Sequence, residues 1–195
     1  MSHYTELQLD ALRELANVGS GNASTALSGM LGRSVDISVP KAQALPFAEA
    51  VEAAGPAEQE ITGIVLGIVG EMNGTVLLLV PPADADKICR MLGVEPDGEY
   101  ALSALGEIGN IVGTSYINAL AAMTGMDIEP TPPTTATDML GALVASVLAG
   151  QAHAGDIALM LDSNLVVEGE DCSISFFLVP DQGGVDELLS RLGLS

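Results

Sequence analysis

The stretch that decides the fold is Asp-Ala-Leu-Arg-Glu-Leu-Ala-Asn at residues 10–17, because Ser-Ala-Leu-Gly-Glu-Ile-Gly-Asn stands at residues 103–110. A glutamate and, three residues later, an asparagine hold the same place in both copies, which lie 93 residues apart. A proline follows each asparagine after 23 residues, at Pro40 and Pro133. Matching residues in one constant frame indicate an internal duplication.

Each copy has the periodicity of an α-helix that bears a polar stripe. Residues three and four positions apart share one face of a helix, so Asp10, Glu14 and Asn17 line up along it. The second copy lines up the matching side chains, which are Ser103, Glu107 and Asn110. We call these two sets stripe 1 and stripe 2. Asparagine is a mediocre helix former, so its place inside both helices favours a functional surface over a merely solvated one.

The elements that follow the first helix indicate a strand and a hairpin. Alternating apolar side chains predict a half-buried strand over 34–40, and the Asn-Gly pair at 73–74 is a strong hairpin signal. The expected order is helix, strand, hairpin and helix, at residues 7–31, 34–40, 61–70 with 75–80, and 82–92. Residues 48–60 are rich in Ala, Glu and Pro, and we expect a surface loop there.

The second half repeats this order with one addition. The expected helix, strand, extra helix, hairpin and closing helix lie at residues 100–123, 126–130, 138–149, 157–167 with 172–179, and 185–192. The extra helix has no clear counterpart in 48–60. The sequence therefore predicts an α+β fold, in which one domain consists of two pseudo-twofold repeats, at about 7–95 and 100–195. We expect their strands to combine into one antiparallel-rich sheet, and the two long helices to carry the stripes.

The charge of the chain excludes several classes of partner. It has 195 residues, with 26 acidic and 6 basic side chains and a net charge of −20. Such a chain is repelled by nucleic acid and by anionic membrane surfaces, so neither is expected as a partner. Apolar residues make up 48% of the sequence, which is too many for a disordered chain. A folded, acid-rich, lysine-poor protein indicates a halophilic source, where salt of about 1 M shortens the Debye length to about 3 Å and screens self-repulsion.

The cysteines and the apolar runs predict a cytoplasmic protein without a metal site of its own. Cys89 and Cys172 lie far apart, with no CxxC pair or histidine-rich cluster to form a zinc site. Reduced thiols are the default in the cytoplasm. The first residues do not read as a signal peptide. The most apolar run, 139–148, is too short for a bilayer, which needs about 20 residues.

The stripes and the two prolines resemble the signature of the CheC family. That family, with CheX and FliY, comprises phosphatases of phosphorylated CheY, the chemotaxis response regulator. The pattern is Asp or Ser, Glu four residues later, Asn three residues after that, and Pro after a further 23, and both copies match it throughout. Two intact copies, spread over essentially the whole chain, resemble CheC more than CheX or FliY. The resemblance implies the same α+β architecture.

The resemblance also implies an activity, the hydrolysis of a phospho-aspartate, with phosphorylated CheY as the partner. A carboxamide can both donate and accept a hydrogen bond, and it stays neutral beside a phosphoryl group. Asn17 and Asn110 would therefore position the attacking water. Glu14 and Glu107, one helical turn earlier, would pair with the active-site lysine of the receiver domain.

The remaining stripe residues are expected to support the helix face or to make secondary contacts. Asp10 and Ser103 occupy the same place in the two copies. The exchange of a carboxylate for a hydroxyl argues against an acid–base role there. No cofactor of the protein's own is expected, since Mg²⁺ would come from the receiver domain.

The extra helix at 138–149 has two interpretations. It is apolar on nearly all faces, so it could be a buried core helix. Alternatively it is an exposed docking patch, which on a monomer would mark a partner. CheC-like proteins use a helix in this part of the second half to bind CheD, the receptor-modifying deamidase. The resemblance implies a CheD patch formed by Asp138, Leu140, Leu143, Val144 and Val147.

Two classes of function other than catalysis stay open at this point. The first is a non-catalytic regulator that binds CheD or phosphorylated CheY, which the apolar helix favours and the duplicated Glu-x-x-Asn argues against. The second is a structural component of the flagellar switch, a class related in fold. We expect no additional switch-type domain in 195 residues, which argues against the second class.

Overall fold

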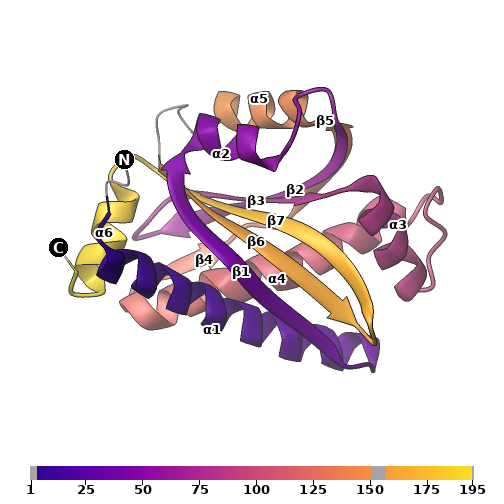
Figure 1. Ribbon diagram of the computed structural model, residues 1–195, viewed down its shortest axis with the longest axis horizontal. Helices are drawn as coiled ribbons and strands as arrows, with labels where there is room; N and C mark the ends of the chain where they lie inside the picture. Colours follow the sequence, from indigo (N-terminus) through magenta and orange to yellow (C-terminus); the bar gives the residue numbers. More distant parts are fainter. Residues whose placement is uncertain (1–3, 151–156, 195) are drawn as a thin grey trace.

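The computed structural model describes residues 4–150 and 157–194, and Figure 1 shows their arrangement. Within this part of the chain, helices cover both faces of one seven-stranded sheet. All strand pairs are antiparallel, in the order β1-β6-β7-β3-β2-β4, with β5 also paired to β2. The strands are β1 Val35–Pro46, β2 Glu60–Gly70, β3 Gly74–Val80, β4 Ile128–Pro130, β5 Thr134–Met139, β6 Ile157–Val167 and β7 Glu170–Pro180.

The two long helices form within one or two residues of the expected bounds, as α1 (Glu6–Leu31) and α4 (Ala101–Thr124). A capping box starts α1: the Thr5 hydroxyl accepts from the Gln8 backbone N–H, and the Gln8 side chain accepts from the Thr5 backbone N–H. Each helix ends at a glycine in the left-handed conformation, Gly32 with φ 63° and Gly125 with φ 70°. Both helix ends expected from the sequence are confirmed.

The two halves of the chain exchange strands. β3 and β7, one from each half, pair at the centre of the sheet, where Val76 lies opposite Leu178. Outside them, β1 of the first half pairs with β6 of the second, and β5 of the second half pairs with β2 of the first. Each half therefore completes the hairpin of the other, and the expected combination of all strands into one α+β sheet is confirmed.

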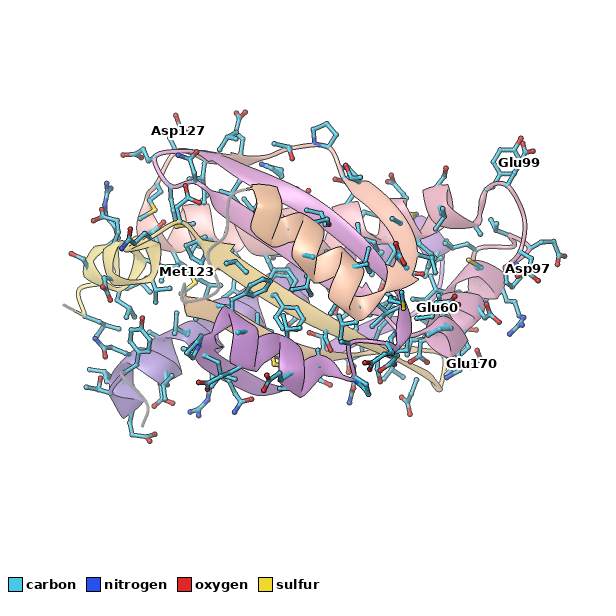
Figure 2. All side chains as sticks on the ribbon, turned by 90° about the horizontal axis from the view of Figure 1, so that it is seen from above. Glu60, Asp97, Glu99, Met123, Asp127 and Glu170 are labelled. Atoms are coloured by element: carbon cyan, nitrogen blue, oxygen red, sulfur yellow. The ribbon has the colours of Figure 1, made fainter. Side chains whose placement is uncertain are left out.

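Two apolar clusters, one on each face of the sheet, hold the layers together. On one face α1 and α4 pack with buried side chains such as Leu15, Leu105 and Phe176. The short helices α3 (Pro82–Met91) and α6 (Gly184–Arg191) contribute to the same cluster. On the other face lie α2 (Phe47–Ala54) and α5 (Leu140–Gly150), which Figure 2 shows from above.

The prediction of a surface loop over 48–60 is wrong, because the helix α2 occupies the first part of this segment. Phe47 and Ala50 are completely buried in the cluster beneath α5, so two apolar contacts in one helical turn stabilise this short helix. The order of elements makes α2 the counterpart of α5, since each follows the strand after its long helix. The expectation that the extra helix has no counterpart is therefore also wrong.

The two prolines that defined the repeat frame lie at irregularities of the sheet. β1 continues past Pro40, beyond its expected end, and its register with β6 shifts between Ser38 and Lys41. In the second half, Pro133 falls between β4 and β5, so the expected strand 126–130 is followed by a second one. Proline has no backbone N–H to donate to a neighbouring strand. The same residue therefore interrupts regular pairing in both halves.

Candidate functional site

The polar stripes lie on the outer surface of the layer formed by α1 and α4. The two helices run side by side in opposite directions beneath the sheet (Figure 1). At their contact there is no room for a side chain on Gly19, since a Cβ there would lie 2.6 Å from Tyr116 Cδ1. Farther along α4, a Cβ on Gly109 would lie 2.6 Å from Ile64 Cγ2 of the sheet. Glycines on the inner faces thus let the helices approach closely and leave the stripes outside.

The burial of the helices confirms the amphipathic pattern. On α1 the apolar face is buried, at Leu12, Leu15 and Ala16, and all three residues of stripe 1 are exposed. On α4 the buried face includes Leu105 and Ile108. Ser103 and Glu107 of stripe 2 are exposed, and Asn110 is half-buried. Both pairs of Glu and Asn side chains are therefore accessible from outside, each pair on its own helix.

Stripe 1 carries an ion pair at its start. Arg13 Nη1 donates to Asp10 Oδ1 at 2.6 Å, and both side chains are at least half exposed. The Asn17 side chain forms no hydrogen bond to any residue in the described part of the chain, although its backbone oxygen accepts from Ser20 Oγ at 2.9 Å. Beside it, Gly21 has no atom within 4 Å of a hypothetical Cβ. No hydrogen bond within the described chain therefore fixes the orientation of the Asn17 amide.

Stripe 2 has different neighbours at the same positions. Gly106 stands where stripe 1 has Arg13, and a Cβ on it would lie 2.8 Å from Thr135 Oγ1 of β5. Thr114 stands where stripe 1 has Gly21, and its hydroxyl lies 3.5 Å from Asn110 Oδ1, at the outer limit for a hydrogen bond. Next to stripe 2, α4 therefore packs on β5, and a hydroxyl lies beside the asparagine where stripe 1 has open space.

The sequence reasoning had not assigned roles to Arg13, Thr114 or Thr135. The first two could have been found by comparing the copies residue by residue, since Arg13 is replaced by Gly106 and Gly21 by Thr114. Thr135 had no such signal, because its place beside α4 depends on the strand β5, which the sequence did not indicate.

The structure buries the apolar side chains of the expected CheD patch. In the cluster beneath α5, four of its five residues are at most 8% exposed, namely Leu140, Leu143, Val144 and Val147. The interpretation as an exposed apolar patch is wrong, and the alternative, a core helix, is confirmed for these side chains. Asp138 is exposed, and its carboxylate accepts from the Met139 backbone N–H at 2.7 Å.

Outside the stripes, the described residues include two cysteines and a cleft. No three His, Cys, Asp or Glu side chains among them are placed to hold a metal ion, and none of their helices could cross a bilayer. Cys89 and Cys172 are buried free thiols, and burial, with the Asp84 carboxylate nearby, raises the pKa of Cys172 to about 11. A cleft of about 580 Å³ between α3 and the β6–β7 turn contains no stripe residue.

Comparison with known proteins agrees with this arrangement. Residues 7–42 and 101–136, which contain the two stripes, match the model of the CheC-like family. The CheY-P phosphatase CheC of Bacillus subtilis (strain 168) is 32% identical over 97% of this chain and 96% of that protein. The chain belongs to the CheC-like family. Its two stripes lie in the two segments that the family model covers.

Solved structures share the fold of this CheC-like protein. FliY of Thermotoga maritima superposes with a TM-score of 0.78 at 19% identity, and the match covers 98% of each chain. A complex of CheX and CheY with BeF₃ and Mg²⁺ from Borrelia burgdorferi gives a TM-score of 0.52 at 16% identity, covering 86% of this chain and 98% of the matched chain. At these identities the likeness extends to the fold alone.

Proposed function

We propose that this CheC-like protein is a phosphatase that hydrolyses the phospho-aspartate of the response regulator CheY. One observation carries the proposal: a Glu and an Asn, one turn apart, are accessible on each of two equivalent helices. The relatives that support it include the CheY-P phosphatase CheC and the flagellar motor switch phosphatase FliY of Bacillus subtilis, which is 28% identical over 66% of this chain and 35% of that protein.

The main task of the protein in this reaction is to position the attacking water. A phospho-aspartate is an acyl phosphate that hydrolyses unaided: water oxygen bonds to phosphorus as the bond from phosphorus to the aspartate oxygen breaks. The products are inorganic phosphate and a free carboxylate. Phosphoryl transfer needs little covalent help and gains most from orientation of the nucleophile. The Asn17 or Asn110 carboxamide would accept from the water and hold it in line with the breaking bond.

The glutamates would fix each helix on its partner. Glu14 and Glu107 precede the asparagines by one turn and are exposed, so either carboxylate can meet the lysine of a receiver active site. An exposed ion pair contributes at most about 1 kcal/mol, and exclusion of water at the interface strengthens it. In this proposal Mg²⁺ and the lysine belong to the receiver, and the phosphatase contributes the amide and the acid.

The proposal includes a location and a second partner. We place the reaction in the cytoplasm, with the receiver. CheD remains a proposed partner near α5, where Asp138 is exposed in β5, two residues before the helix begins. The buried side chains of α5 would then hold the helix in place without touching CheD.

Replacement of the two asparagines tests the activity. A receiver domain is phosphorylated with a small phosphodonor, and release of inorganic phosphate is followed with the wild type, Asn17→Ala, Asn110→Ala and the double variant. Loss of a positioning group costs about a hundredfold in rate, so the double variant should fall to the receiver's own rate. Asn22→Ala, which removes an exposed amide of α1 outside the stripe, is the matched control.

Two results would contradict the proposal. A double variant that keeps wild-type phosphate release would rule out the amides as the source of activity. A wild-type protein that binds the phosphorylated receiver and does not speed phosphate release would make it the non-catalytic regulator.

A further inference from the structure

The two most exposed large apolar side chains in the described part of the chain occupy equivalent positions. Leu7 is 64% exposed and Tyr100 is 67% exposed. They lie 93 residues apart, the same interval that relates the two stripes. An exposed apolar side chain is common by itself, and its recurrence in the frame of the duplication calls for a shared cause.

Both side chains extend the stripes toward the start of their helices. Leu7 precedes Asp10 by three residues, and Tyr100 precedes Ser103 by three. Leu7 lies in the first turn of α1. Tyr100 is in register with α4, since its carbonyl oxygen accepts from the Ala104 backbone N–H at 2.9 Å. Residues at this spacing share a helix face, so each stripe begins with an apolar side chain.

Local hydrogen bonds hold these helix starts in place. Beside Leu7, Gln8 completes the capping box, and its amide nitrogen donates to the carbonyl oxygen of Leu194, which ties the first turn of α1 to the C-terminal segment at 2.9 Å. Before Tyr100, a tight turn joins the Gly98 N–H to the Glu95 carbonyl at 2.9 Å. A backbone that is already fixed loses little further conformational entropy when a partner covers the side chains on it.

We propose that Leu7 and Tyr100 are apolar anchors through which each stripe docks on a phosphorylated receiver domain. The inference rests on the proposed function, because the occupant follows from continuity with the Glu and Asn of the same stripe. Leu7 and Asn17 are ten residues apart, or about 15 Å along a helix, well within the footprint of one protein interface. Tyrosine is among the residues that most often dominate such interfaces.

The charge of the protein explains why apolar anchors are needed. A chain with net charge −20 meets a partner that bears a phosphoryl group, so long-range electrostatics opposes the encounter. At about 1 M salt the attraction of Glu14 or Glu107 for a lysine is screened beyond about 3 Å. Burial of apolar surface is not weakened by such screening. The anchors would therefore supply the part of the affinity that salt leaves intact.

A binding measurement tests the contribution of the anchors to affinity without any contribution from hydrolysis. The probe is a receiver domain loaded with Mg²⁺ and beryllofluoride, which mimics the phosphoryl group and is not hydrolysed. The Leu7→Ser, Tyr100→Ser double variant of the full chain should raise the Kd about tenfold, which corresponds to about 1.4 kcal/mol. Leu7→Met with Tyr100→Phe should restore the affinity. Met30→Ser, a 40% exposed apolar side chain at the far end of α1, should leave it unchanged.

Each anchor can be assigned to its own stripe in hydrolysis assays. With stripe 2 disabled by Asn110→Ala, Leu7→Ser should raise the KM about tenfold and leave kcat within a factor of two. With stripe 1 disabled by Asn17→Ala, the same rise should follow Tyr100→Ser. The assignment would be overturned if KM rose equally when the substituted anchor belonged to the disabled stripe, as with Tyr100→Ser in the Asn110→Ala background.

The outcomes distinguish this inference from the proposed function. If the asparagine variants lose hydrolysis while the anchor variants keep the wild-type Kd, the anchors are wrong and the phosphatase stands. If the asparagine variants keep wild-type hydrolysis, the proposed function fails. If the anchor variants convert a dimer into a monomer in sedimentation and leave receiver binding intact, the occupant of this surface is a second copy of the chain, which also overturns the inference.

Discussion

Stripe 1 and stripe 2 carry the same glutamate and asparagine in different surroundings. Stripe 1 lies fully in solvent, with an ion pair between Arg13 and Asp10 at one end and an open space at Gly21. Beside stripe 2, Gly106 packs against Thr135 of β5, and the Thr114 hydroxyl lies 3.5 Å from Asn110 Oδ1. The duplication kept the glutamate and the asparagine and let the residues around them diverge. The identity of the reactive groups therefore does not fix how well each site is organised.

The largest expected effect comes from a change at the contact between α1 and α4, the two helices that carry the stripes. Gly19→Ala would place a Cβ 2.6 Å from Tyr116, whose ring packs on Phe176 with centroids 4.3 Å apart. Overpacking of this kind costs about 2 kcal/mol, even though alanine favours a helix. Urea denaturation should show the loss. Gly21→Ala, two residues on in open space, is the control and should gain about 1 kcal/mol. Equal stabilities would show that the helices separate easily.

The next effect compares the two asparagines directly. Asn110 is half-buried with the Thr114 hydroxyl 3.5 Å away, whereas Asn17 is exposed, so we expect stripe 2 to carry most of the turnover. We expect Asn110→Ala to lower kcat about tenfold and Asn17→Ala less than twofold, since an oriented group needs less reorganisation to act. Phosphate release at saturating receiver measures both. If Asn17→Ala lowered kcat more than Asn110→Ala, the exposure of the asparagine would matter more for turnover than its fixed orientation.

Removal of the Thr114 hydroxyl beside Asn110 should have a smaller effect on kcat. Thr114→Val keeps the shape of the side chain and removes its hydroxyl, so kcat of stripe 2 should fall about threefold, in keeping with one long hydrogen bond. The assay uses the Asn17→Ala background, in which stripe 1 is disabled. Thr25→Val, which removes an exposed hydroxyl elsewhere on α1, serves as control. An unchanged kcat would assign Thr114 a purely structural role.

The smallest effect concerns the ion pair of stripe 1. Asp10→Ser makes stripe 1 resemble stripe 2 at this place and leaves Arg13 unpaired. Pairs one turn apart on an exposed helix contribute about 0.3 to 0.5 kcal/mol and are screened by salt. Thermal unfolding in dilute buffer should detect a loss of this size, and the loss should vanish at about 1 M salt. A loss that persists there would show that the pair is not mainly electrostatic.

Much of the fold followed from periodicity, and the misses have physical causes. The helices α1 and α4, both hairpins and the exposed stripes were expected, because long amphipathic patterns and an Asn-Gly turn are local signals. The helix α2 was missed because Phe47 and Ala50 are buried in a cluster with side chains of the second half, such as Leu140. The burial of Leu140 has the same origin: an apolar helix looks alike from its sequence whether it covers a sheet or a partner.

In the candidate site, too, local features could be predicted and contacts between distant segments could not. The positions of Glu14, Asn17, Glu107 and Asn110 could be predicted, because helical spacing alone puts them on one face. The contact of Gly106 with Thr135 could not, since it depends on how closely α4 approaches β5. The halophilic source, Mg²⁺ from the receiver and CheD binding stay predictions. Unfolding at rising salt, for which we expect a steep gain in stability, checks the first of these.

The exchange of strands between the halves has a consequence for synthesis of the protein. Val35 in β1 pairs with Val167 in β6, and Pro46 with Ile157, so residues of the first strand are synthesised 132 to 111 residues before their partners. Its open edge must wait through most of translation, and unpaired strand edges are prone to association with other chains. A nascent chain of this kind benefits from its long first helix, which can form at once and shield the apolar side of β1 until the last hairpin arrives.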